Sequence, residues 1–119
     1  MTRRFPTVVY GHGDEPDARF TLANERTFLA WIRTALALIA GGVALELLGL
    51  DLQPVLRLSA SLVLAVTGIL IPVLAWVAWA RTERALRQNR ALPGSLLGVV
   101  LGVAVTIAGI LVVLAILVR

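Results

Sequence analysis

Two arginines and one glutamate in the first long apolar segment carry the most chemical information in this sequence. Arg26 and Arg33 lie near its start, and Glu46 lies near its far end. Ionisable groups at such depths in an apolar segment are costly, so they indicate a function or a pairing. A guanidinium stays charged and binds phosphate through two parallel hydrogen bonds. The pattern therefore favours anion binding over bond-making chemistry.

The spacing of these residues on a helix predicts two distinct faces. At about 100° per residue, one face combines both arginines with small side chains. This face consists of Arg26, Ala30, Arg33, Ala37, Ala40, Gly41 and Ala44. On the opposite side Ala35, Gly42 and Gly49 recur every seven residues, a spacing suited to close left-handed packing against another helix. Neither face is typical of one that contacts lipid, so we expect this helix at the centre of an assembly.

The elements that carry these residues are long apolar runs at about 27–50, 58–80 and 96–118. Each run is close to the roughly 20 residues that cross a bilayer. The composition agrees, because 59% of the residues are hydrophobic and only 15% are charged. The expected fold class is therefore an all-α membrane protein with three transmembrane helices.

The region before the first run is polar and contains two prolines. Residues 1–16 are predicted to form a flexible tail, and residues 17–119 the membrane domain. Asp17 is suited to cap a short amphipathic helix that carries Phe20 and Leu22. We expect this helix to lie at the membrane surface and to precede the first span.

The arginines also predict the orientation. Four of them precede the first span and four follow the second in the segment 81–90, whereas Arg57 is alone in the first connection. The positive-inside rule then places the N-terminus in the cytoplasm and the C-terminus outside the plasma membrane. The 81–90 cluster is either a topology determinant alone or part of a ligand site. Glu46 is expected to pair with Arg57, to be satisfied in a subunit contact, or to snorkel to the interface.

The third run contains Gly98 and Gly102, a small-xxx-small pair that predicts a further helix-packing surface. The sequence contains no set of residues typical of a catalytic or metal site. The chain has no cysteine, and its single histidine, His12, lies between two glycines without a second ligand at metal spacing. Neither a P-loop nor a dinucleotide fingerprint is present. We expect no enzyme activity, no cofactor, no metal and no nucleic-acid partner.

The segment from Asp17 to Gly42, above all LANERTFLAWIRT at 22–34, resembles the signature of the YidH-like domain of unknown function. That domain is similar to the membrane portion of the vacuolar transporter chaperone complex. There, copies assemble around a central path for inorganic polyphosphate, which an attached cytosolic polymerase makes. The resemblance implies that Arg26 and Arg33 are basic residues of a pore entrance, that Glu25 orients them, and that Arg81 belongs to the same mouth. This sequence has no polymerase domain, so the resemblance does not imply polyphosphate synthesis.

Two functions follow as hypotheses. The first is a homo-oligomer, a trimer or a pentamer, that forms or completes an anion or polyphosphate path lined by the first helix. Three helices alone cannot enclose such a path. The second is a non-conducting scaffold or accessory subunit that binds a partner membrane protein or anchors a cytosolic enzyme. In that case Arg33 snorkels to the interface and Arg26 contacts headgroups of the membrane lipids.

Overall fold

The structure, a computed structural model, describes Val9, Gly11 and residues 13–48 and 50–119. Its three long helices are α2 (Ala18–Leu47), α3 (Pro54–Arg87) and α4 (Leu97–Leu117). Each is long and apolar enough to cross a membrane. The prediction of an all-helical chain with three candidate spans is confirmed for the described residues. Most of the predicted tail, His12 included, lies outside them.

The prediction of a separate amphipathic helix before the first span is wrong. Residues 18–26 form the first turns of α2, which continues without a break to Leu47. The sequence explains this continuity, since residues 18–40 contain neither glycine nor proline. Asp17 does cap this helix, because its Oδ1 accepts a hydrogen bond of 2.8 Å from the Arg19 backbone N–H. Hydrogen bonds from the Arg19 side chain and backbone lower the pKa of Asp17.

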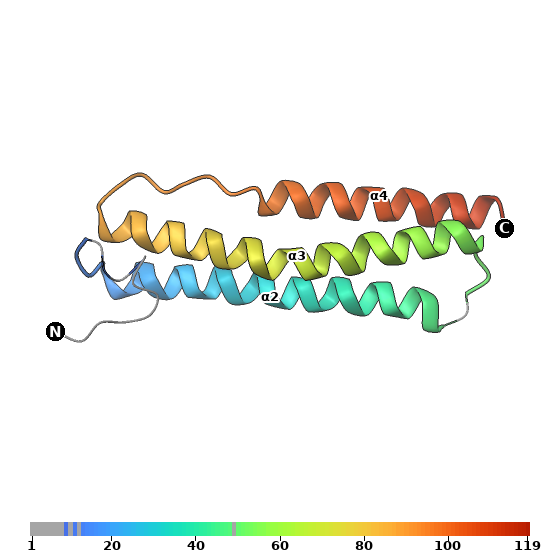
Figure 1. Cartoon of the computed structure of the whole chain (residues 1–119), viewed down its shortest axis with the longest axis horizontal. Helices are drawn as coiled ribbons and strands as arrows, with labels where there is room; N and C mark the ends of the chain where they lie inside the picture. The colour runs from blue at the N-terminus through green and yellow to red at the C-terminus, as the bar shows by residue number, and fades with distance from the viewer. Residues whose placement is uncertain (1–8, 10, 12, 49) are drawn as a thin grey trace.

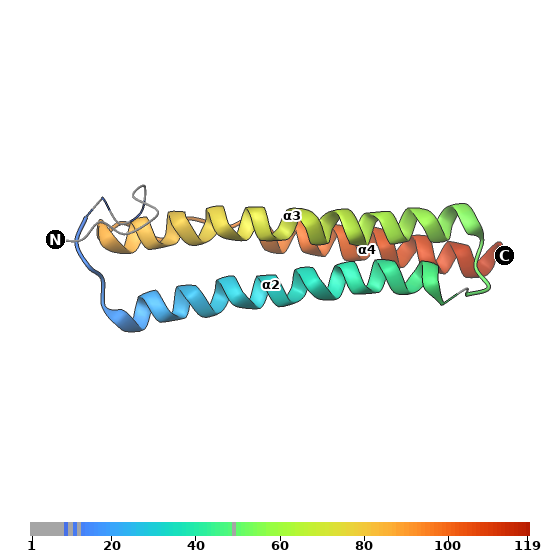
Figure 2. The same cartoon turned by 60° about the horizontal axis from the view of Figure 1, so that its bottom comes forward.

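The helix α3 lies between the other two helices (Figure 1), and in the turned view α4 runs behind α3 while α2 lies in front (Figure 2). It packs against α2 on one side and α4 on the other, whereas the backbones of α2 and α4 are not adjacent. Side chains of α2 meet α4 only around Leu97, which shares one apolar cluster with Ala35 and Leu38 in the described part of the chain. The described helices therefore form an open row rather than a closed bundle. One copy of this row encloses no path across a membrane.

Small residues set the distance between α2 and α3. Ala35 and Gly42 are buried in this interface, as predicted for a packing face, and their partner is α3 of the same chain. A Cβ atom added at Gly42 would lie 2.7 Å from the carbonyl oxygen of Ser61. One added at Gly68 would lie 2.8 Å from the carbonyl oxygen of Ala35. The backbones approach this closely only because side chains are missing between them. Gly49 lies outside the described residues.

The interface between α3 and α4 uses a different set of positions from the one expected. Its buried α4 residues recur at intervals of seven, four and seven, as in left-handed helix packing. They are Leu97, Ala104, Ala108 and Ala115. Gly98 and Gly102 lie on another side of α4, where an added Cβ would meet nothing within 4 Å. Their predicted packing role is thus not fulfilled among the described residues of one chain.

Replacing Gly68 with alanine should destabilise the fold, because the new methyl group would collide with Ile39 and with the Ala35 carbonyl. Overpacking of this kind costs about 1–3 kcal/mol. Thermal unfolding in mild detergent, followed by circular dichroism, measures the loss. The matched control is Gly102→Ala, the same change at an open helical position, which should leave the midpoint unchanged or slightly higher. Equal midpoints for the two variants would contradict this packing.

Candidate functional site

The lengths of the helices define a membrane zone and a part that extends beyond it. α4 has 21 residues and is about 32 Å long, close to the roughly 30 Å of a hydrocarbon core. Two contacts show which parts of the other helices lie level with α4. At its start, Leu97 lines one cleft with Trp31 of α2 and Ala78 of α3, and near its end the Ala115 carbonyl accepts a hydrogen bond from Gln53 N, just before α3. A bilayer that matches α4 therefore leaves the first turns of α2 and the last turns of α3 outside (Figure 1). We call residues 13–28 together with 79–90 the basic end.

A buried carboxylate joins the two helices of the basic end. Glu83 is 1% exposed. The Thr21 hydroxyl donates to its Oε2 at 3.1 Å, and the Asn24 amide donates to its Oε1 at 3.3 Å and to the Trp79 carbonyl at 3.1 Å. Among the described residues Glu83 forms no ion pair, so neutral donors alone compensate its burial. This cluster fixes the start of α2 against α3.

The sequence reasoning missed Glu83, although signals were present. It is the only acidic residue in the run from Arg81 to Arg90. Thr21 and Asn24 are three apart and therefore share a face of α2, which makes them natural partners for one acceptor. An isolated acid within a basic run is also typical of a solvated surface, so the sequence alone does not show that Glu83 is buried.

A second contact attaches the segment before α2 to the end of α3. The Arg87 side chain is 5% exposed, and its Nη1 lies 3.2 Å from Glu15 Oε1. The Arg87 carbonyl accepts from Asp14 N at 2.8 Å. Gly13 has a φ of +66°, and a side chain there would collide with that carbonyl. One arginine of the 81–90 cluster is thus already paired with a carboxylate.

Unlike Arg87, Arg26 and Arg33 have no carboxylate partner among the described residues. Both are exposed, and neither forms a hydrogen bond or an ion pair with any residue that the structure describes. They share an outward surface with three exposed alanines, and we call this set the open face of α2. Its members are Arg26, Ala30, Arg33, Ala37 and Ala40. Five of the seven residues expected in this stripe are thus exposed, whereas Gly41 and Ala44 are half-buried and Gly41 faces Leu64 of α3.

The depth of the two arginines differs. Arg33 lies two residues beyond Trp31, about 3 Å along the helix axis, so it is near the edge of the membrane zone. Arg26 lies before Trp31, in the basic end. Glu25 is exposed, and within the described chain it makes no ion pair with either arginine. The two exposed arginines therefore occupy successive levels of α2, Arg26 in the basic end and Arg33 at the edge of the membrane zone.

The structure separates Arg81 from this pair. Arg81 precedes Glu83 by two residues, a helical rotation of about 200°, and so lies on the side of α3 away from Glu83 and α2. It lines a cleft of about 110 Å³ with residues of the connection between α3 and α4. In a single chain it does not belong to the same mouth as Arg26 and Arg33.

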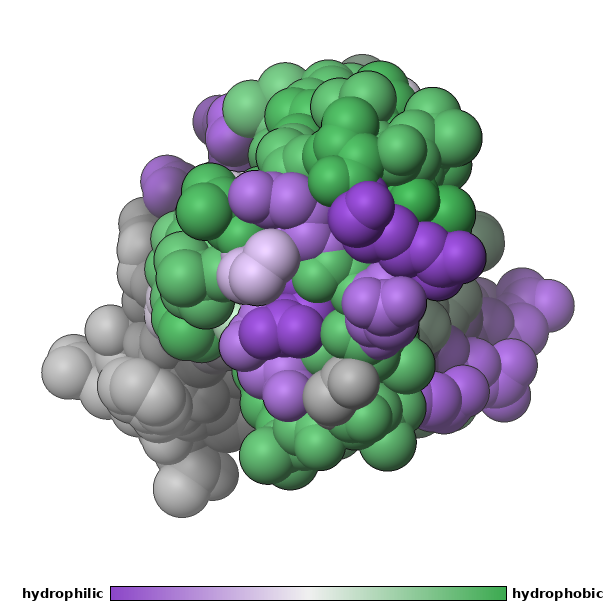
Figure 3. Space-filling view, turned by 90° about the vertical axis from the view of Figure 1, so that its right-hand side faces the viewer, coloured by the Kyte–Doolittle hydropathy of each residue, from purple (hydrophilic) through white to green (hydrophobic). Residues whose placement is uncertain are grey.

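The far end of the row carries its own charges. Glu46 Oε1 accepts from Arg57 Nε at 3.2 Å and from the Ser61 hydroxyl at 3.4 Å. This geometry matches the intrachain pairing considered for Glu46. Hydrophilic side chains gather at this tip, between hydrophobic surfaces above and below it (Figure 3). The polar groups here are largely satisfied by one another.

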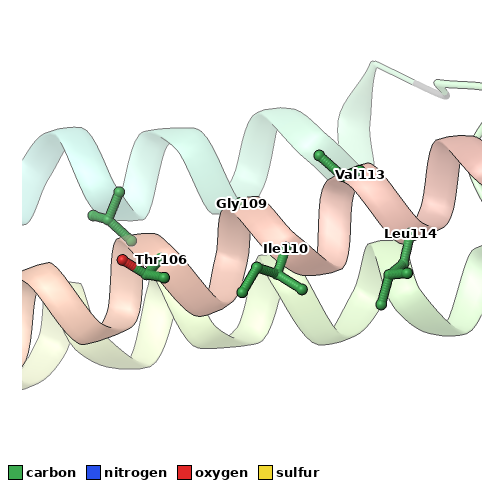
Figure 4. Close-up of a pocket in the computed structure, with 6 residues that line it drawn as sticks. Thr106, Gly109, Ile110, Val113 and Leu114 are labelled. Carbon is green, nitrogen blue, oxygen red and sulfur yellow. The ribbon is translucent and has the colours of Figure 1, made fainter.

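The outer side of α4 carries an apolar groove of about 430 Å³ (Figure 4). Its lining is Val105, Thr106, Gly109, Ile110, Val113 and Leu114. The Thr106 hydroxyl is the only side-chain polar group in this set. The groove offers contact with lipid or with another helix, and no catalytic chemistry. The described residues also contain no group of three or more potential metal ligands.

Removing the Glu83 carboxylate should loosen the basic end. Glu83→Leu leaves the Thr21 and Asn24 donors without their buried acceptor, which costs about 1–3 kcal/mol. Unfolding of Glu83→Leu, Asn24→Leu and the double variant forms a double-mutant cycle. We expect a coupling of about 0.5–3 kcal/mol. A coupling of zero would show that these side chains do not interact.

The chain matches one protein family and is similar to several known proteins. Residues 19–85 match the family described as "Domain of unknown function (DUF202)", and this range holds Thr21, Asn24 and Glu83. "Inner membrane protein YidH" of Escherichia coli is 46% identical over 82 residues, 68% of this chain and 71% of the relative. "Uncharacterized protein Rv2272" of Mycobacterium tuberculosis is 50% identical over 80 residues, 66% of each chain. No solved structure matches significantly. The chain therefore belongs to the DUF202 family.

Proposed function

We propose that this protein forms a homo-oligomer in the inner membrane in which the open face of α2 lines a path for anions. One observation carries the proposal. Arg26 and Arg33 are exposed and unpaired among the described residues, while Ala35 and Gly42 on the opposite side of the same helix are buried against α3. A face that combines small residues with arginines at its cytoplasmic end is suited to line a lumen with a basic entrance.

Several copies are needed because one chain is an open row of helices. In a trimer or a pentamer, Arg26 and Arg33 would repeat as rings around the axis. Such rings attract anions, and guanidinium groups match phosphate geometry. The resemblance to the membrane portion of the vacuolar transporter chaperone complex supports polyphosphate as the anion. We propose no catalytic step for this chain.

The membrane assignment and orientation complete the proposal. Three helices have the length and composition of spans, and a relative is named an inner membrane protein. The basic end carries most of the arginines, whereas the described far end has Arg57 and Arg119, both near carboxylates. The positive-inside rule therefore favours a cytoplasmic basic end. Trp76 and Trp79, whose ring centroids are 6.3 Å apart, would lie at the headgroup level on that side.

The basic end itself favours a second candidate function, a non-conducting scaffold. The Glu83 cluster and the Arg87–Glu15 pair hold two helix ends and the preceding segment together outside the membrane zone. A preorganised surface of this kind is suited to bind a partner membrane protein or to anchor a cytosolic enzyme. A partner that co-purifies with the wild type and is lost in Glu83→Leu would support this function.

Flux measurements test the conducting function. Purified protein in liposomes should pass chloride or short-chain polyphosphate, and Arg33→Ala should lower the flux about tenfold or more, since it removes a ring of charge–phosphate contacts. Arg26→Ala should lower it as well. The control is Arg90→Ala, an exposed arginine that is not on α2. Equal flux in wild type and Arg33→Ala, or no flux in either, would remove the proposed path.

Cysteine labelling tests the orientation, and the absence of native cysteine makes single-site labelling clean. Asp51→Cys places a thiol at a residue whose side chain is 92% exposed at the far end, and Ala91→Cys places one after the basic end. A membrane-impermeant maleimide should label Asp51→Cys in spheroplasts. It should label Ala91→Cys only after the membrane is permeabilised. The reverse pattern would invert the topology.

A further inference from the structure

We propose that the cleft at the start of α4 binds the phosphate group of an anionic phospholipid. The cleft of about 110 Å³ lies between α3 and the connection that leads into α4. Its polar lining comes from Arg81, Thr82 and Ser95, and the backbone of 93–96 closes it. Basic pockets between membrane helices on the cytoplasmic side are known sites for lipid headgroups.

The polar groups of the cleft are available to a ligand. Arg81 is exposed and forms no ion pair within the described chain, unlike Arg19, Arg57 and Arg87, each of which has a carboxylate partner. The Ser95 hydroxyl oxygen accepts from Leu97 N at 3.2 Å, which leaves its hydrogen free to donate. The Thr82 hydroxyl makes no hydrogen bond with the described residues. One cation and two hydroxyl donors thus line the same space, a set that suits a phosphate monoanion.

The gradient of polarity along the cleft favours a lipid over a free anion. Leu74, Val77 and Ala78 line it toward the membrane zone, one to two turns before Arg81 and Thr82 on the same helix. Because α4 begins at this level, the polar part lies where headgroup phosphates lie and the apolar part where acyl chains begin. A free phosphate would use only the polar part. A phospholipid would fill both.

This site goes beyond the proposed function and is spatially independent of it. Arg81 lies on the side of α3 that faces away from α2, so a bound lipid would not occupy the open face of α2. The lipid would instead fill the space between α3 and the connection to α4. We expect it to stabilise the start of α4, whose Leu97 is buried against the core.

Native mass spectrometry of the detergent-solubilised protein tests the site by titration with phosphatidylglycerol and, as a neutral comparison, phosphatidylcholine. Wild type should bind phosphatidylglycerol at least tenfold more tightly than phosphatidylcholine. Arg81→Gln should remove this preference, and Thr82→Val, which keeps the shape but loses the hydroxyl, should weaken it by a smaller factor. The matched control Arg90→Gln removes an exposed arginine outside the cleft and should retain the preference.

Several outcomes would overturn the proposal. Equal loss of preference in Arg81→Gln and Arg90→Gln would indicate diffuse charge attraction. Competition by inorganic phosphate or pyrophosphate at the same concentrations as the lipid would indicate a free-anion site.

Unfolding midpoints without added lipid identify any variant that fails to fold, and Arg81→Lys then substitutes for Arg81→Gln. Because a lysine keeps the charge but loses the bidentate geometry, it should bind more weakly, and unchanged binding counts against the site.

Discussion

The close approach of α2 and α3 determines the rest of this structure. At Gly42 and Gly68 the two backbones are too near for any intervening side chain, so the helices cannot slide without a steric clash. That fixed register brings Thr21 and Asn24 opposite Glu83, several turns away. It also decides which side of α2 remains outward. The close contact between α2 and α3 therefore positions the hydrogen-bonded Glu83 cluster on one side of α2 and the open face, with its unpaired arginines, on the other.

Charge at the basic end is divided between structure and surface. Arg87 is buried, and its ion pair with the exposed Glu15 holds the segment before α2, while Arg19 pairs with Asp17 at the helix cap. Arg26 and Arg33 have no such partner in the described chain, and Arg81 has none in its own cleft. Exposed ion pairs contribute little to stability, so the Arg19–Asp17 pair adds only modestly to the stability of the fold. The unpaired arginines are those with the capacity to bind something from outside.

Much of the architecture could be predicted from the sequence, because apolar length alone identifies membrane-crossing helices. The cap at Asp17 and the packing face with Ala35 and Gly42 were also predictable, since both depend on local spacing. The separate amphipathic helix was wrong because a helix without glycine or proline has no reason to stop at a change of polarity. Glu83 and the separation of Arg81 from Arg33 depend on which side of α3 meets α2. One sequence does not contain that information. The packing role of Gly98 and Gly102 stays a prediction, since an added Cβ at either residue meets nothing within 4 Å in the described chain.

The open row of helices constrains the symmetry of any assembly built from it. Copies in one membrane must keep their basic ends on the same side, so the rotation axes that relate them run along the membrane normal. The two edges of the row differ, since α2 exposes arginines and alanines whereas α4 exposes an apolar groove beside glycines. An interface that joins the α4 edge of one copy to a different surface of the next is heterologous, and it leaves the open face of α2 free to line the axis. Such interfaces close into rings and, unlike isologous ones, allow odd numbers of subunits.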